Sequence, residues 1–171
     1  MKYESGSAFR RALEERLRNR NIQTGIPLVW LRKMVAFDRF LARLFALYPD
    51  KWVVKGGLAL QLRLGGKART TKDIDVLALA YRQNIYPALR DAGALDLGDW
   101  FLFEVERSAK DSADDFGGLR FQARVILDGR AFEIFHIDVG AGDPVLEAPE
   151  NLASDLEDLF RSTPRHPRFL L

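Results

Sequence analysis

The 171-residue chain is 47% hydrophobic and 29% charged, which is the composition of an ordinary globular domain that can bury a core. The absence of cysteine and the presence of only two histidines exclude a disulfide framework, a cysteine zinc site, a thiol nucleophile and a histidine-rich metal centre. No apolar run approaches the ~20 residues of a membrane span, and no signal peptide follows Met1. We therefore expect a cytoplasmic protein with no membrane partner.

Helical and alternating hydrophobic patterns follow one another along the chain. In chain order they predict helices over residues 7–21 and 28–48, a strand over 52–54, a helical stretch over 58–64, a strand over 73–80, a helix over 81–92, and strands over 99–108, 119–127 and 130–139. Asp128-Gly129 predicts a two-residue hairpin turn between the last two strands. This order predicts an α+β (α/β-like) fold, in which helices back a small mixed sheet and a helical pair comes first.

We expect three parts along the chain. Residues 1–49 form an N-terminal helical segment packed on the core, residues 50–146 form the core itself, and residues 147–171 form a C-terminal extension. The extension ends in an apolar stretch, which is expected of a fold that is cut off part-way.

The net charge of +2 hides two opposed halves. Residues 1–72 carry 16 Lys and Arg against 5 Asp and Glu, whereas residues 73–171 carry 10 against 19. A basic half suits a surface that binds phosphates, and an acidic half suits a place where carboxylates gather. The alternative is that the basic residues are only the solvated side of two helices.

An Asp-Ile-Asp sequence lies within the predicted strand over residues 73–80. Residues two apart in a strand point to the same side, so Asp73 and Asp75 project together while Ile74 points into the core. Two like charges beside each other are unfavourable without a counter-charge, and oxygen ligands on a rigid strand suit Mg²⁺ or Mn²⁺. The alternative is a solvated strand end, with the aspartates paired to Lys72 and Arg69.

A third carboxylate, Asp138, lies near the end of the last predicted strand. If that strand lies beside residues 73–80, three aspartates meet at one edge of the sheet, as two-metal phosphoryl transfer requires. By itself, an Asp before Val-Gly often only begins a turn. His136 lies on the same side of the strand, where it either contacts a substrate phosphate or is simply packed and hydrogen-bonded.

A glycine pair, Gly56-Gly57, follows the strand over residues 52–54. Glycines here allow the backbone to approach a ligand closely and to direct N–H groups at an anion. A lone Gly-Gly is most often only a tight turn. The glycine pair is evidence for a phosphate site because of its position. It lies between a strand and a short helix, and a strand with Asp-x-Asp follows.

This order resembles the nucleotidyltransferase fold of the polymerase-beta superfamily. The segments "KGGLALQLRLGGKARTTKDIDV" and "FHIDVGAGDPV" are similar to the AbiEii toxin family, which includes the MenT-type toxins of type IV toxin–antitoxin systems. The resemblance covers roughly residues 28–171. It implies a phosphate cradle, two metal ligands and a third carboxylate that helps to activate the acceptor hydroxyl: Gly56 and Gly57, Asp73 and Asp75, and Asp138, respectively. Three further residues match family positions near the triphosphate: Lys55, Arg69 and Thr71.

The resemblance also implies a reaction. A nucleoside monophosphate would be transferred from an NTP to a hydroxyl of RNA, at a tRNA 3′ end, with Mg²⁺ (or Mn²⁺) as cofactor and a cognate antitoxin protein as partner. Family members continue into a helical C-terminal half, so residues 147–171 are expected to begin a missing helical region. A catalytically silent, truncated module that binds nucleotide, antitoxin or RNA is the alternative. Transfer to a small molecule, as in aminoglycoside-modifying relatives of the fold, is a third possibility.

Overall fold

The computed structural model describes residues 3–64, 71–79, 84–108, 118–141, 149, 151–152 and 169–170 of the chain. The elements, in chain order, are α1 (Gly6–Thr24), α2 (Leu28–Leu47), β1 (Trp52–Lys55), α3 (Gly56–Leu64), β2 (Ile74–Ala78), α4 (Ile85–Ala94), β3 (Phe101–Arg107), β4 (Leu119–Leu127), β5 (Arg130–Ala141), β6 (Asn151–Leu152) and β7 (Phe169–Leu170). The predicted α+β fold, in which two helices precede a mixed sheet, is confirmed.

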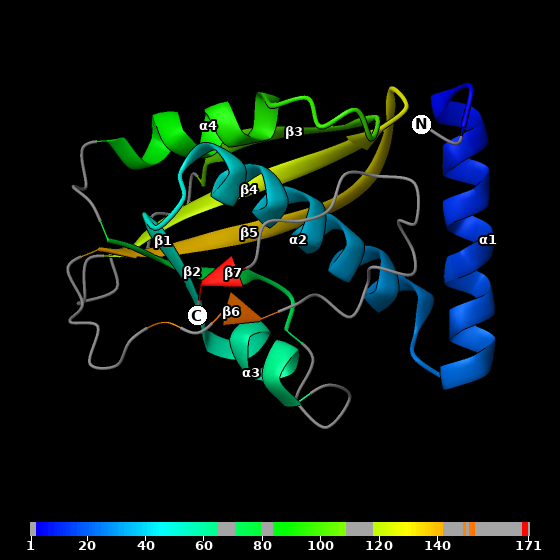
Figure 1. Cartoon of the computed structure of the whole chain (residues 1–171), viewed down its shortest axis with the longest axis horizontal. Coiled ribbons are helices and arrows are strands. Elements are labelled where there is room, and N and C mark those ends of the chain that lie inside the picture. Colours follow the sequence, from blue (N-terminus) through cyan, green and yellow to red (C-terminus); the bar gives the residue numbers. More distant parts are fainter. Residues whose placement is uncertain are drawn as a thin grey trace.

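Five strands form one mixed sheet in the order β1-β2-β5-β4-β3 (Figure 1). β2 and β5 run parallel, and the other neighbouring strands run antiparallel. Strand β3 shows the difference between the two faces of the sheet: Phe101 and Phe103 are buried, whereas Leu102 and Glu104 are exposed. Because side chains alternate between the faces, one face belongs to the core and the other is open for polar residues.

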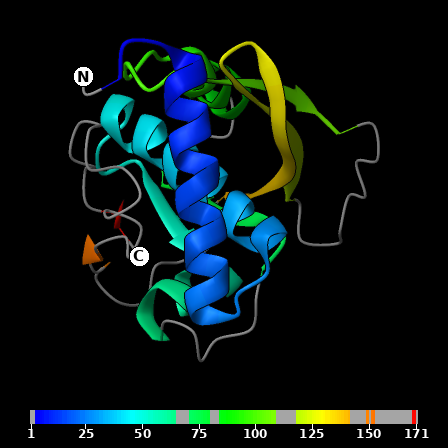
Figure 2. The same cartoon turned by 90° about the vertical axis from the view of Figure 1, so that its right-hand side faces the viewer.

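Helices cover the buried face. α2 crosses it diagonally in Figure 1, and the ring of its Phe37 lies edge-on to Phe135 of β5 with centroids 5.0 Å apart. α4 packs so closely on β3 that a Cβ atom at Gly93 would come 2.4 Å from the carbonyl oxygen of Phe103. Figure 2 shows α1 along the outside of the molecule, next to α2. The carboxylates are therefore carried by strands whose other face is fixed by aromatic packing.

The helix that precedes β3 differs from the prediction. It covers Ile85–Ala94 instead of residues 81–92, and Pro87 lies in its first turn, where a missing N–H breaks no helical hydrogen bond. α3 also begins two residues earlier than predicted, at Gly56.

Two arginines of α2 are wholly buried with an aspartate. Arg43 donates hydrogen bonds to both oxygens of Asp99, and Arg39 contacts Asp99 at 3.4 Å. Arg43 also donates to the carbonyls of Leu95 and Phe101, at 2.9 and 2.8 Å. The side chains of both arginines and of Asp99 are 0% exposed. Part of the positive charge of the first half therefore lies inside the protein and joins α2 to the start of β3.

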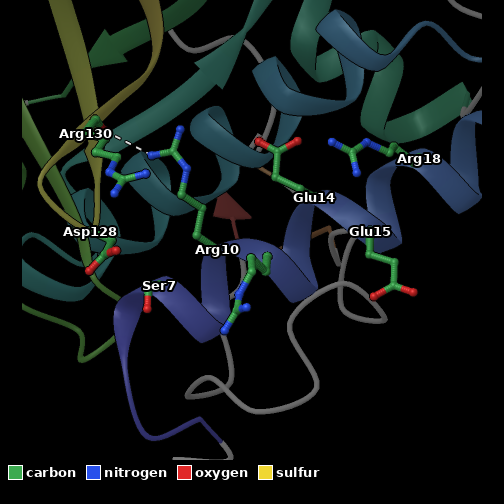
Figure 3. A pocket seen from close by; sticks show the side chains of 8 residues that line it. Ser7, Arg10, Glu14, Glu15, Arg18, Asp128 and Arg130 are labelled. Carbon is green, nitrogen blue, oxygen red and sulfur yellow. Dashed lines mark hydrogen bonds between the residues drawn. The ribbon is translucent and has the colours of Figure 1, made fainter.

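Arg10 attaches α1 to the β4–β5 hairpin. Its guanidinium donates to the carbonyls of Leu127, Arg130 and Ala131, at 2.9, 3.4 and 3.2 Å. Figure 3 shows Arg10 reaching from α1 to Arg130, in a hollow that Arg18 and other charged residues of the helix also line. This hollow is formed by α1 and the hairpin turn, so none of the three aspartates lines it.

We expect Arg10→Met to lower the free energy of unfolding by about 1–2 kcal/mol, because hydrogen bonds from a charged donor are lost. The amides of α1 should also exchange faster than those of the sheet, since the helix loses its attachment to the hairpin. Urea denaturation and hydrogen exchange would measure the two effects. Arg18→Met, two turns along the same helix and in the same hollow, is the control and should change little; equal losses in both variants would contradict the attachment.

The C-terminal segment contains a short strand pair that the sequence pattern did not predict, while the expected start of a helical region stays a prediction. Its described residues form a two-stranded antiparallel ladder in which Asn151 lies opposite Leu170 and Leu152 opposite Phe169. β7 of this ladder contacts β1 and α2. The division at residues 49 and 146 stays a prediction. Among the described residues, no helix combines the length and hydrophobicity that a membrane crossing requires.

Candidate active site

Four strands place charged residues side by side in a row across the sheet. Lys55 of β1 lies opposite Asp75 of β2, and Asp75 lies opposite Asp138 of β5. Asp138 in turn lies opposite Arg120 of β4. Neighbouring strands are ~4.8 Å apart, so the two central carboxylates are close neighbours and each has a cation on its outer side. The predicted meeting of Asp75 and Asp138 is therefore present in the structure.

The third aspartate, Asp73, immediately precedes β2. One carboxylate oxygen accepts a hydrogen bond from the backbone N–H of His136 at 3.2 Å and lies 3.3 Å from the Nδ1 of the same residue. The other oxygen accepts from Arg120 at 3.1 Å. The hydroxyl of Thr71 donates to the backbone carbonyl of Asp73 at 3.0 Å. Asp73 thus lies beside the other two aspartates and is held there by His136 of β5, whose contact with a substrate phosphate stays a prediction.

Gly56 and Gly57 begin α3 directly against the carboxylates. A Cβ atom at Gly56 would come 2.3 Å from Oδ2 of Asp75, and its φ of +67° is one that L side chains rarely adopt. A Cβ atom at Gly57 would come 3.1 Å from the Cβ of Thr71. The backbone N–H of Gly57 donates a hydrogen bond to Asp75. The glycines therefore allow a close backbone approach, as expected, but the group they approach is the protein's own carboxylate.

Crowding of negative charge is visible in the pKa of Asp75, which is raised above its ordinary value. Burial is the main cause, and repulsion by Asp138 and Asp73 adds to it. Lys55 and the Gly57 N–H act in the opposite direction without cancelling the rise. Asp75 is thus a half-buried carboxylate beside two others.

Arg120 is a site residue that the sequence motifs do not indicate. Its guanidinium lies between two of the three aspartates, 3.1 Å from Oδ2 of Asp73 and 3.3 Å from Oδ2 of Asp138. The sequence shows only an arginine in an alternating strand, where a solvent-facing charge is the ordinary expectation. The contact depends on the register between β4 and β5.

That register leaves a signal in the sequence. β4 turns its odd-numbered residues toward the core, and the second half of β5 does the same. A two-residue turn at Asp128-Gly129 would set odd residues opposite even ones, yet residues opposite each other must point to one face. One extra residue resolves the conflict, and the structure inserts it as a bulge at Phe132. The shifted register then sets Arg120 opposite Asp138.

Three aspartates provide the oxygen ligands that Mg²⁺ and Mn²⁺ prefer, and Asp75 is repelled by the other two carboxylates. Within the described ranges, no three Asp, Glu or His side chains are arranged as ligands of one metal ion. The guanidinium of Arg120 lies between Asp73 and Asp138 instead. The donors therefore fit a divalent cation in chemistry and charge, provided that Arg120 moves.

The other predicted site residues are placed as follows. Lys55 ends β1 and is exposed beside Asp75, and Thr71 is half-buried beside Gly57. Arg69 lies outside the described residues. Binding of phosphate by Lys55, Thr71, Arg69 and the two glycines stays a prediction.

Residues 39–165, which span all eight predicted site residues, match the family described as "Nucleotidyl transferase AbiEii toxin, Type IV TA system". The chain belongs to this family. The resemblance seen in the glycine and aspartate motifs of the AbiEii family is thereby confirmed over more than half of the chain. No curated protein is significantly similar in sequence.

One similar solved structure is the crystal structure of a candidate nucleotidyltransferase from H. pylori. It is 16% identical to this AbiEii family member, with a TM-score of 0.46, and the match covers 75% of this chain and 55% of the other. This chain thus spans about half the length of that protein.

We expect Gly56→Ala to disturb the site more than strain alone would. The left-handed backbone costs alanine about 1–2 kcal/mol, and the new methyl group would add about 1–3 kcal/mol by displacing Asp75. Gly25→Ala is the matched control, because Gly25 has a φ of +72° and nothing within 4 Å of the added Cβ. Urea denaturation gives the loss in free energy of unfolding for both variants. Equal losses would show that the Asp75 side chain moves aside at no energetic cost.

Proposed function

We propose that this AbiEii family member is a metal-dependent nucleotidyltransferase, which transfers a nucleoside monophosphate from an NTP to a hydroxyl of RNA. The observation that carries the proposal is the register pairing of Asp75 with Asp138, with Asp73 beside them. Three carboxylates on neighbouring strands, next to a glycine-rich helix start, supply what phosphoryl transfer between oxygens needs.

Each group has a part in this reaction. Asp73, Asp75 and Asp138 would hold Mg²⁺ or Mn²⁺, which neutralises the charge that develops on the transferring phosphoryl group. Asp138 would accept the proton of the attacking hydroxyl. That oxygen forms a bond to the α-phosphorus, the bond from phosphorus to the bridging oxygen breaks, and pyrophosphate leaves.

The phosphates of the NTP need positive partners. The N-terminus of α3, at Gly56-Gly57, directs backbone N–H groups and the positive end of the helix dipole toward the carboxylate row. Lys55 is exposed at the adjacent strand end. We assign the outer phosphates to these groups, together with Arg69 and Thr71.

RNA is the acceptor that the charge distribution favours. Exposed arginines of α1 and of the hairpin, including Arg11, Arg18 and Arg130, offer contacts to a phosphate backbone. We propose the 3′ end of a tRNA as the acceptor and a cognate antitoxin as the protein that restrains the activity, because the family is that of type IV toxin–antitoxin toxins. A cytoplasmic location follows from these partners.

A second function, nucleotide binding without transfer, is favoured by the position of Arg120. In the structure this guanidinium lies where carboxylates and a metal would meet. If it never moves away, the chain is a silent module that binds nucleotide, antitoxin or RNA.

One experiment separates the two functions. The full 171-residue chain would be incubated with total tRNA, Mg²⁺ and each α-labelled NTP in turn, and label in RNA and released pyrophosphate would be counted. Asp138→Asn should lose transfer, whereas Glu104→Gln, which changes an exposed carboxylate on β3, should keep it. Binding of NTP without label in any RNA would support the silent module and contradict the transferase.

A further inference from the structure

Arg120 bridges two aspartates that come from different parts of the sequence. Its Nη2 donates to Asp73 at 3.1 Å, and its Nη1 lies 3.3 Å from Oδ2 of Asp138. Asp73 precedes β2 and Asp138 lies on β5, so one side chain of β4 holds the two together. A guanidinium is suited to this because its N–H groups form a planar fork that contacts two oxygens at once.

In the metal-free protein, Arg120 supplies a positive charge between two carboxylates that would otherwise repel each other. Among the residues that the structure describes, Lys55 lies at the β1 side of the aspartates and Arg120 at the β4 side. Without Arg120, Asp73 and Asp138 would lose the cation that lies between them. Guanidinium and divalent cation thus meet the same electrostatic need, and one excludes the other from the oxygens that they share.

The three side chains are exposed enough for a metal ion to take the place of the guanidinium. The side chain of Arg120 is 39% exposed, and those of Asp73 and Asp138 are 29% and 35% exposed. Solvent can therefore receive the guanidinium when it leaves. The buried Arg43, at 0% exposure, has no such freedom. Arg43 is therefore a fixed part of the core, whereas the guanidinium of Arg120 can be displaced into solvent.

We propose that Arg120 is a resident counter-cation, which a divalent cation must displace from Asp73 and Asp138 before it can bind. This inference rests on the proposed function, in which these aspartates hold the metal. Arg120 then acts as a positioning residue, because it keeps the two carboxylates together in the metal-free protein. It also lowers the affinity for metal, because it competes for the same carboxylate oxygens.

Binding of Mn²⁺ alone, without nucleotide, tests the proposal. Calorimetry on the wild type, Arg120→Met and Arg124→Met gives the three dissociation constants. Arg124 is the matched control, because it lies four residues further along β4 on the same face and contacts Glu104 at 3.8 Å. We expect Arg120→Met to bind Mn²⁺ about tenfold more tightly than the wild type, and Arg124→Met to bind as the wild type does.

A second readout does not depend on activity. Metal-free Arg120→Met should melt at a lower temperature than the wild type, and saturating Mn²⁺ should raise its melting temperature by more. If Arg120→Met does not fold, the Nε–H signal of Arg120 in wild-type NMR spectra serves instead. Addition of Mg²⁺ should move that signal toward the position and solvent exchange of a free guanidinium.

The outcomes are distinguishable. Equal or weaker Mn²⁺ binding by Arg120→Met, or an Arg120 signal that Mg²⁺ leaves unchanged, overturns the counter-cation while the proposed function stands. Absence of Mn²⁺ binding by all three proteins overturns both.

Discussion

Replacement of Asp75 by asparagine is expected to slow nucleotidyl transfer strongly and, at neutral pH, to stabilise the folded protein. Asp75 lies in the middle of the carboxylate row, so its loss should lower the transfer rate by on the order of 10²–10³-fold. The same change removes a half-buried negative charge that is repelled by Asp138 and Asp73. Function and stability should therefore move in opposite directions.

The rate of label transfer and the urea midpoint of unfolding measure the two effects. Glu104→Gln is the control, since it neutralises an exposed carboxylate of β3 and should leave both unchanged. A variant Asp75→Asn that transfers label at the wild-type rate would remove Asp75 from the proposed chemistry. One that is less stable than the wild type would show that its hydrogen bond from Gly57 outweighs the repulsion.

The effect of Asp75 on stability should depend on pH. Its pKa is raised in the folded protein above the ordinary value of 3.8. The unfolded chain therefore releases this proton at a lower pH than the folded one, and the stabilising contribution of the protonated group is lost as the pH rises through the folded pKa. The advantage of Asp75→Asn over the wild type should be absent below pH 3.8 and grow as the pH rises above it. A stability difference that is constant with pH would contradict the raised pKa.

The largest loss of stability is expected from Asp99→Ala. This change leaves Arg39 and Arg43 buried without the carboxylate that they share, and breaking a buried ion pair in this way costs about 3–5 kcal/mol. A domain of this size is typically stable by about 5–15 kcal/mol, so the variant should be close to unfolding at room temperature.

Urea denaturation of Asp99→Ala and of Asp96→Ala gives the comparison. Asp96 is an exposed carboxylate of the same loop that accepts a hydrogen bond from the backbone N–H of Gly98. Its removal should cost about 1 kcal/mol or less. Similar losses in the two variants would mean that Arg43 finds sufficient partners in the carbonyls of Leu95 and Phe101.

Local pattern predicts most of the fold. The alternation of β4 and β5 is strong, because each strand has one face in the core. The spacing of the apolar residues also predicts α2, although this helix is buried on all sides from Met34 to Phe45. Asp75 and Asp138 could be brought together by assuming that their strands are neighbours, which the structure bears out. The side-chain geometry of the site could not be derived in this way, since the position of Arg120 depends on a single bulge.

Charged residues limited the prediction of the fold from sequence more than apolar residues did. A helix pattern assigns arginine to solvent, whereas Arg39 and Arg43 face Asp99, which lies more than fifty residues further along the chain. Nothing in the local sequence marks such a partner, because burial of an ion pair is decided by tertiary packing. The short β6–β7 ladder was missed because its pattern is too short to distinguish helix from strand, whereas α4 was predicted as a helix with a different start.

The parallel pairing of β2 with β5 has a consequence for synthesis of the protein. Asp73 and its hydrogen-bond partner His136 are separated by 63 residues, so this closure is a long-range event that local folding cannot replace. A ribosome-bound chain that has emerged only as far as the Asp128-Gly129 turn contains Asp73 and Asp75 but not Asp138. The carboxylate row thus comes together only after β5 has left the ribosome and joined the sheet, and a chain of a toxin family cannot assemble it before then.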